Sequence, residues 1–291
     1  MAGDRALKEY KITANSRFHR VFTDRSTTVK ETIDYFAAKG FDGIDVNLEY
    51  IAEFGEDWRS KVAEHAEYAA SKGLDLSFGH LPFHSSLCRG ADGKPDKAAF
   101  RQFTFDSLEA AKIIGIRRAV IHPKHDTARE ADLDANFKLN IEKLSPFMER
   151  AEQLGIRLLV ENMPNYYTDG QIRYGTLPEH IAAIADYFGC GNCWDTGHAN
   201  ITGVDQRAGI NLLGKRLGGL HLNDNVEGHI DAHLIPFFGT TDWKGVMQGL
   251  ADIDYDGTFN FECRTYHMPE AASGYVGEHL LCVAHTLLGM M

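Results

Sequence analysis

The sequence predicts a single (β/α)8 barrel, the TIM barrel of the α/β class, with residues 1–291 forming one domain. Apolar segments typical of buried parallel strands alternate with helical segments along the whole chain. The alternation occurs eight times, and 291 residues is an ordinary length for one barrel. An open doubly wound sheet is the alternative, but no glycine-rich phosphate-binding fingerprint follows an early strand.

The predicted strands are short apolar segments, and the fifth, Ile156 to Val160, is apolar almost throughout, as burial on both faces requires. We expect strands at residues 10–15, 41–47, 74–80, 118–123, 156–162, in the segment leading to Asp195, and at 219–224 and 258–263. The stretch 193–200 is too short for a helix, and we expect it to be a strand end where the backbone turns.

The predicted helices begin at capping residues and end at glycines. Thr28 and its neighbours cap the first, which Gly40 ends, and Gly115 and Gly155 end two later ones. We expect helices at residues 28–38, 58–71, 96–114, 135–154, 177–188, 208–217, 242–251 and 275–288. Residues 48–57 should form an acidic loop after the second strand.

Composition excludes several classes of function. The net charge of -11 argues against a general nucleic-acid or anionic-membrane surface. No apolar run approaches the roughly 18 residues of a membrane span, and the first residues lack an apolar signal core. Five cysteines, an odd number, favour a reducing compartment, so we expect a cytoplasmic protein. Homo-oligomerisation is left open.

Potential ligands follow six successive predicted strands. They are His80, His122, Glu161, Asp195, His221 and Glu262. In a barrel these C-terminal strand ends meet at one face and carry the chemistry. A buried carboxylate must be paired, protonated or metal-bound, which favours site roles for both glutamates. Asp231 and His233, spaced by one residue in the loop after the seventh strand, could project into the same site.

This mixture of carboxylates and imidazoles suits a divalent metal such as Zn, Mn or Mg. We expect one metal, with up to three compatible with the residues. Two chemistries follow. A metal that chelates a hydroxy-ketone would stabilise an enediolate while carboxylates move the proton. Several metals that share carboxylates would instead activate water against a phosphate ester.

The chain resembles the xylose isomerase-like barrels. These include sugar phosphate isomerases and epimerases, ketose 3-epimerases, and apurinic endonucleases of the endonuclease IV type. The resemblance covers nearly the whole chain and rests on the segments 79–82, 120–123, 160–162, 195–198, 220–224, 230–233 and 261–262. These segments together are specific for the superfamily and less so for any one activity.

The resemblance implies a shared metal position and further roles for neighbouring residues. The metal ligands would be Glu161, Asp195, His221 and Glu262, and Glu161 and Glu262 would also be the catalytic acid/base pair. Residues implied or suggested to bind substrate are His198, His80, His122 and Arg264, with Lys124 a second source of positive charge for a sugar phosphate. The endonuclease pattern adds metal ligands at His80, His122, His198, Asp231 and His233.

The leading hypothesis is a metal-dependent sugar or sugar-phosphate isomerase or epimerase with a small-molecule sugar partner. The segment 231–243 resembles the sugar enzymes, and the acidic loop and overall charge oppose DNA binding. The chain departs from the ketose epimerases where they have an arginine soon after the seventh strand, since Glu227 lies in that region. The alternatives are a trinuclear zinc apurinic-site phosphodiesterase and a non-catalytic sugar- or metal-binding barrel.

Overall fold

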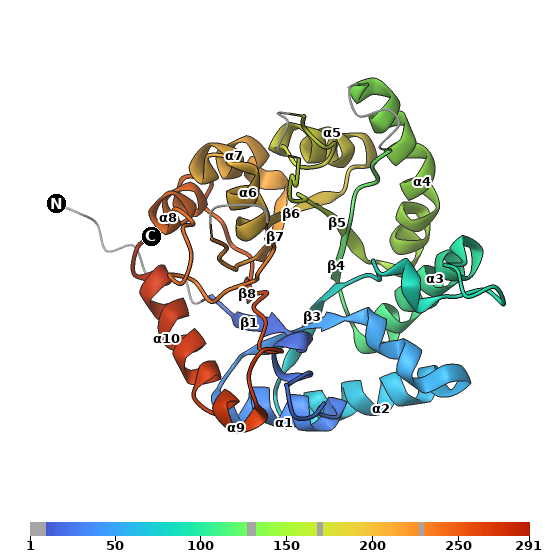
Figure 1. The fold of residues 1–291 in the computed structure, drawn as a ribbon, viewed down its shortest axis with the longest axis vertical. Coiled ribbons are helices and arrows are strands. Elements are labelled where there is room, and N and C mark those ends of the chain that lie inside the picture. Colours follow the sequence, from blue (N-terminus) through green and yellow to red (C-terminus); the bar gives the residue numbers. More distant parts are fainter. Residues whose placement is uncertain (1–9, 127–131, 168–170, 227–229) are drawn as a thin grey trace.

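The computed structural model describes residues 10–126, 132–167, 171–226 and 230–291. Its eight parallel strands form one sheet in the order β7-β6-β5-β4-β3-β2-β1-β8. A parallel bridge between Leu222 and Phe261 joins the two ends of this order, so the sheet closes into a barrel (Figure 1). The strands are β1 (Ile12–Asn15), β2 (Gly43–Asn47), β3 (Asp75–His80), β4 (Arg118–Ile121), β5 (Arg157–Glu161), β6 (Gly191–Asp195), β7 (Leu217–His221) and β8 (Phe259–Phe261). The predicted (β/α)8 barrel is confirmed.

The helices surround the strands on the outside of the barrel (Figure 1). They are α1 (Val29–Lys39), α2 (Trp58–Ser71), α3 (Lys97–Ile114), α4 (Leu133–Leu154), α5 (Pro178–Phe188), α6 (Thr196–Thr202), α7 (Gln206–Leu213), α8 (Trp243–Asp252), α9 (Glu270–Ser273) and α10 (Val276–Leu288). Short 3-10 segments include η1 (Ser16–His19), η2 (Leu48–Asp57), η3 (Ser85–Leu87) and η5 (Gly214–Arg216). In the part of the chain that is described, no helix is both long and apolar enough to cross a membrane.

The predicted caps define the helix ends. Thr28 accepts a hydrogen bond from the Glu31 N–H, and Glu31 accepts one from the Thr28 N–H, which completes a capping box at α1. Gly40, Gly115 and Gly155 end α1, α3 and α4 in the left-handed conformation that favours glycine. These local signals explain why the predicted bounds of these helices lie within a few residues of the observed ones.

Three predicted boundaries were wrong. The stretch 193–200 is not only a strand end: Asp195 caps α6, which Gly203 ends in the left-handed conformation. The helix predicted to reach residue 217 ends at Leu213, because Gly214 leaves helical geometry with φ 53 and ψ -129. The expected acidic loop 48–57 is the 3-10 segment η2.

The barrel interior is filled by a small apolar layer, Phe78, Val120, Leu159 and Cys193. A larger apolar layer lies between the strands and the helices. Glycine is needed at Gly219, because a Cβ there would lie 2.6 Å from the Phe78 ring. The interior layer fills the axis, so chemistry is confined to the C-terminal ends of the strands.

Candidate active site

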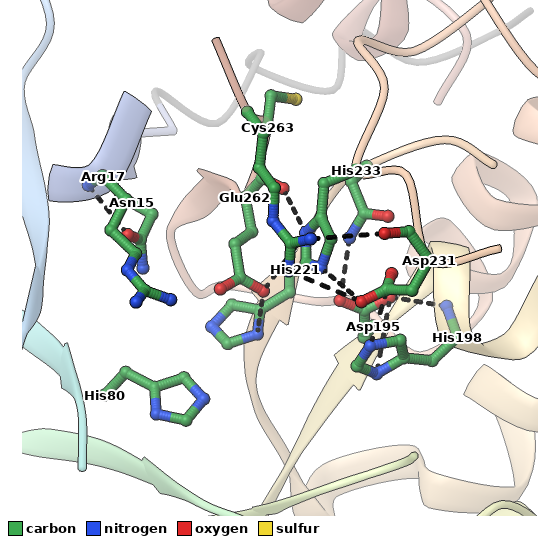
Figure 2. A network of polar contacts seen from close by, with 12 residues as sticks. Asn15, Arg17, His80, Asp195, His198, His221, Asp231, His233, Glu262 and Cys263 are labelled. Carbon is green, nitrogen blue, oxygen red and sulfur yellow. Dashed lines mark hydrogen bonds and ion pairs between the residues drawn. The ribbon is translucent and has the colours of Figure 1, made fainter. Parts of the chain in front are cut away.

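The six strand-end residues that the sequence predicted converge at the C-terminal face of the barrel. His80, Glu161, Asp195 and His221 are the last residues of β3, β5, β6 and β7, and His122 and Glu262 directly follow β4 and β8. Figure 2 shows His80, His221 and Glu262 pointing toward one space, with Asp195 and His198 beside it. Parallel strands place these side chains together because all their carboxyl ends lie at the same face.

The centre of the site is the group Glu161, Asp195, His221 and Glu262, whose ligand atoms all lie within 4.8 Å of one another. His221 Nδ1 lies 2.6 Å from Glu161 Oε1 and 3.2 Å from Glu262 Oε2. One imidazole nitrogen of β7 thus faces two carboxylate oxygens, one from the end of β5 and one that follows β8. Only a proton or a cation makes this arrangement favourable.

A second group consists of His80 and His122, which contact the other carboxylate oxygen of Glu161, Oε2. The Nε2 atoms of His80 and His122 are 3.1 Å apart, and they lie 3.3 and 3.0 Å from Glu161 Oε2. Burial lowers the pKa of His122 to about 4, although Glu161 opposes this effect. A neutral His122 presents a lone pair in place of a charge, which is the form that binds metals.

A third group combines α6 with the loop after β7. His198, Asp231 and His233 have ligand atoms within 4.8 Å of one another. His233 Nε2 lies 2.8 Å from Asp231 Oδ2, and His198 Nε2 lies 3.8 Å from Asp231 Oδ1. Burial opposes ionisation of Asp231, but the hydrogen bond from His233 and the nearby His198 ring hold its pKa well below the usual range.

Backbone carbonyls orient three of these histidines. Nδ1 of His80, His198 and His233 donates to the carbonyl oxygens of Leu81, Asn162 and Glu262, at 2.7, 2.8 and 2.7 Å. Each Nε2 therefore faces the site, where loss of its proton on metal binding would leave a lone pair for coordination. Fixing the tautomer through the second ring nitrogen is how proteins prepare histidines to bind metals.

Asp195 is held by two asparagines for which the sequence predicted no role. The Asn162 side chain accepts from the Asp195 N–H at 2.7 Å and donates to its carbonyl at 2.9 Å. Asn223 Nδ2 donates to Asp195 Oδ2 at 2.8 Å. Asp195 Oδ1 caps α6 by accepting from the His198 N–H at 2.7 Å. Burial raises the pKa of Asp195 to about 6.

Asp45 on β2 was also missed. It is fully buried, and its Oδ2 lies 3.6 Å from His221 Nε2, the ring nitrogen away from Glu161. The same oxygen accepts hydrogen bonds from Asn15 Nδ2 at 2.9 Å and Asn260 Nδ2 at 3.0 Å. A polar residue at an inward position of a buried strand was the only signal in the sequence that could have found it.

The electrostatics of the other ionisable groups follow from burial and neighbouring charges. Burial raises the pKa of Glu161, but His221, His122 and His80 more than offset this and hold it well below its usual value. Burial lowers the pKa of His198, but Asp195 and Asp231 together raise it to about 10. Without a cation, then, the carboxylates are compensated by protonated imidazoles.

Two arginines lie near the candidate site, and the sequence predicted only one of them, Arg264. Arg264 contacts Asp231, with Nη1 donating to its carbonyl at 3.3 Å and Nη2 lying 3.5 Å from Oδ2. A cation that the sequence did not suggest, Arg17, lies 3.3 Å from Glu49 and over the Phe83 ring, which packs against His122. Glu227 lies outside the described residues.

The donor set fits a divalent metal. Each of the three groups combines carboxylate oxygens with imidazole nitrogens, and neutral nitrogens and anionic oxygens are the ligands of Zn, Mn and similar ions. Glu161 and His221 also form a candidate set with His80, whose ligand atom lies within 4.8 Å of theirs. A cation at the central group would take over the role that protonated imidazoles fill without it.

Comparison with known proteins establishes the family. The family model described as xylose isomerase-like TIM barrel matches residues 33–280. The chain belongs to this family. One relative, a D-psicose 3-epimerase of Enterocloster bolteae, is 26% identical over 238 residues, which cover 78% of this chain and 74% of that protein. An uncharacterized protein of Methanocaldococcus jannaschii is 28% identical over 242 residues, covering 74% of this chain and 78% of its own.

Solved structures of this family share the barrel over nearly its whole length. A D-psicose 3-epimerase with D-tagatose from Clostridium cellulolyticum H10 has a TM-score of 0.73 at 17% identity and covers 96% of this chain and 99% of its own. The 3-keto-D-glucoside 4-epimerase of E. coli has a TM-score of 0.70 at 17% identity and covers 96% of this chain and 100% of its own. At this identity the likeness shows the fold alone.

Proposed function

We propose that this protein is a divalent-metal-dependent isomerase or epimerase of sugars or sugar phosphates. The observation that carries the proposal is the position of two carboxylates, Glu161 and Glu262, within 2.6 and 3.2 Å of one nitrogen of His221. A substrate bound at this point would have a carboxylate on either side. The names of the epimerase relative and of the epimerase structures support the same class of enzyme.

The residues divide into ligands, acid/base groups and substrate contacts. Glu161, Asp195, His221 and Glu262 would hold one metal ion. When bound, the metal would polarise the substrate carbonyl and stabilise the negative charge of the enediolate. One glutamate, ionised, removes the proton from the carbon next to the carbonyl. The other must enter this step protonated, and it donates its proton on the opposite face or to the neighbouring carbon, so the two exchange protonation states in each turnover.

His198, His80 and His122 would orient the hydroxyl groups of the sugar. His198 is fixed by the Asn162 carbonyl and His80 by the Leu81 carbonyl, so their Nε2 atoms have set directions. Arg264, which contacts Asp231, would also bind the substrate. Orienting groups of this kind raise the rate by holding the reacting carbon near the base.

Substitution of the two glutamates tests the proposal. Glu161→Gln and Glu262→Gln keep side-chain shape but remove the base, so we expect each variant to fold and to lose turnover of ketoses by at least about a thousandfold. Turnover would be followed by NMR of the sugar products, and folding by circular dichroism. Wild-type turnover in either folded variant would contradict the acid/base assignment.

A second candidate is favoured by one observation. The group His198, Asp231 and His233 adds ligands beyond those that one metal needs, as a trinuclear phosphodiesterase would require. Cleavage of an abasic-site oligonucleotide at low enzyme concentration, with no activity on ketoses, would favour this candidate. Thermal stabilisation by polyols without any turnover would instead favour a non-catalytic binding barrel.

A further inference from the structure

A groove with a volume of about 640 Å³ lies between α3 and α4, directly outside the ring of strands. Phe100 and Thr104 of α3 form one wall, and Leu139 of α4 forms part of the other. Pro82 and His122 also line it, and His122 Nε2 contacts Glu161 in the candidate site. The groove and the site therefore share one residue.

Lys124 lines this groove two residues after His122. Its backbone is held on both sides by Asn140 of α4, whose Oδ1 accepts from the Lys124 N–H at 2.7 Å and whose Nδ2 donates to the Lys124 carbonyl at 2.8 Å. Asn140 is fully buried. These two bonds fix the point from which the lysine side chain extends into the groove.

The ammonium group of Lys124 has no partner among the described residues, although the side chain is half-buried. Withdrawing an ammonium group from water without an opposite charge is unfavourable. Proteins normally place a carboxylate at such a position. An anionic ligand in the groove would supply the missing charge.

The other charged residues around the groove add to this local positive field. Three further cations, Lys97, Arg101 and Lys143, line it together with two carboxylates, Asp126 and Glu142. Glu142 is bound by Lys143 at 2.7 Å. Such an excess of cations is notable in a chain with a net charge of -11, whose overall field repels anions.

We propose that this groove binds the phosphate group of a phosphorylated ketose, with Lys124 as its main contact, while the sugar extends past His122 to Glu161. The inference rests on the proposed function and specifies its substrate class. A phosphate dianion supplies the charge that Lys124 lacks, and lysine binds it as a point charge. A free sugar would leave the ammonium group unpaired.

The kinetic test uses the metal-loaded enzyme and the Lys124→Met variant, which removes the charge and keeps the length of the side chain. We expect KM for phosphorylated ketoses to rise about ten- to a hundredfold, with kcat changed less than about threefold. Constants for the free ketoses should not change. Lys112→Met, on an exposed part of α3 outside the groove, is the matched control and should behave as wild type.

Two kinetic results would overturn the inference. One is a wild-type enzyme that prefers free ketoses to their phosphates. The other is an unchanged KM for phosphorylated ketoses in Lys124→Met. If kcat falls while KM is unchanged, Lys124 acts on the chemistry at His122 and not on the phosphate.

Binding of inorganic phosphate separates this inference from the proposed function. Isothermal titration calorimetry on wild type, Lys124→Met and Lys112→Met requires no turnover. We expect weak binding to wild type and Lys112→Met and its loss in Lys124→Met. If phosphate binds through Lys124 but no ketose or ketose phosphate reacts, the groove is an anion site and the proposed function is wrong. Absence of phosphate binding to wild type, or equal binding to Lys124→Met, would overturn the inference.

Discussion

Asp45 and His221 show how a single contact can orient a candidate metal ligand. Asp45 Oδ2 faces His221 Nε2, so Nδ1 of the same ring is left to face Glu161 and Glu262. Two asparagine amides also donate to this oxygen, which favours its ionised form, although burial raises the pKa of Asp45. A carboxylate behind a histidine ligand orients the ring and strengthens it as a donor.

Asp45→Asn should therefore weaken metal binding. The amide cannot supply the negative charge behind His221, and we expect the affinity for Zn or Mn to fall about ten- to a hundredfold. Competition with a chromophoric chelator measures this without reference to activity. The control is Asp42→Asn, because Asp42 accepts from the Ile12 N–H at 2.7 Å at the other end of the strand. Equal metal affinity in Asp45→Asn and wild type would contradict the role.

Sequence alone found the candidate ligands, which the fold brings together, better than the residues that support them. Glu161 interrupts an apolar run at a strand end, where a carboxylate is costly, so its chemistry stands out. Asp45 lies within a strand that has other polar residues, and nothing local indicates that His221 faces it. Asn162 and Asn223 act through backbone and side-chain geometry that only the folded barrel brings together.

At the scale of elements, α6 connects the site to the fold. Asp195 ends β6, caps α6 and belongs to the central ligand group. Gly197 in its first turn has no room for a side chain, because a Cβ would lie 1.9 Å from Asn223 Oδ1 and 2.4 Å from Asn225 Nδ2. A helix of seven residues is too short for periodicity to reveal, which is why the sequence prediction missed it.

Gly197→Ala should reduce both stability and metal affinity. The added methyl group must displace Asn223, which donates to Asp195 Oδ2, and overpacking of this kind costs about 1–3 kcal/mol. Denaturant unfolding and chelator competition measure the two effects. Gly274→Ala is the matched control, since no atom lies within 4 Å of its Cβ position. Wild-type stability and affinity in Gly197→Ala would show that the close approach is not important.

The connection between β1 and α1 contains a buried histidine, His19, which is not one of the candidate metal ligands. His19 stacks on Tyr35 with ring centroids 3.7 Å apart, and its carbonyl accepts from the hydroxyls of Thr27 and Thr32. Burial lowers the pKa of His19 from 6.5 to about 4. The folded protein therefore keeps this ring neutral at pH values where the unfolded chain protonates it.

This difference predicts a pH-dependent stability. Below pH 6.5 the unfolded chain binds a proton that the folded protein does not, so the free energy of unfolding falls as the pH drops toward 4 and the His19 contribution then levels off. The contribution is at most about 3 kcal/mol. His19→Phe keeps the ring contact but cannot titrate. Its unfolding free energy should therefore decline less than that of wild type between pH 7 and pH 4.5, and equal declines would refute the assignment.

At the scale of the whole molecule, the alternation of strands and helices was enough to predict the barrel. Each strand is local in sequence, and closure then brings residues from His80 to Glu262 to one face without any further signal. The sequence does not determine the number of bound metal ions. That number depends on whether separate ligand groups fill independently, and residue types alone do not decide that.

We predict about one tightly bound metal per chain in protein purified without added metal, as measured by mass spectrometry of metal content. The central group has four candidate ligands, and two of them, Glu161 and His221, also form a set with His80. An ion at the central group therefore leaves fewer ligands for a second. Removal of the metal by a chelator should lower the melting temperature. Three zinc ions per chain would contradict the single-metal account and favour the phosphodiesterase.

The most direct test of the proposed chemistry is hydrogen exchange at carbon. The metal-loaded protein is incubated in D2O with a panel of ketoses and ketose phosphates, and deuterium in the sugars is followed by NMR. We expect deuterium at the carbon next to the carbonyl, together with a new epimer or isomer, and neither in Glu161→Gln nor after metal removal. Absence of exchange with every sugar, together with cleavage of an abasic-site oligonucleotide by the same preparation, would contradict it.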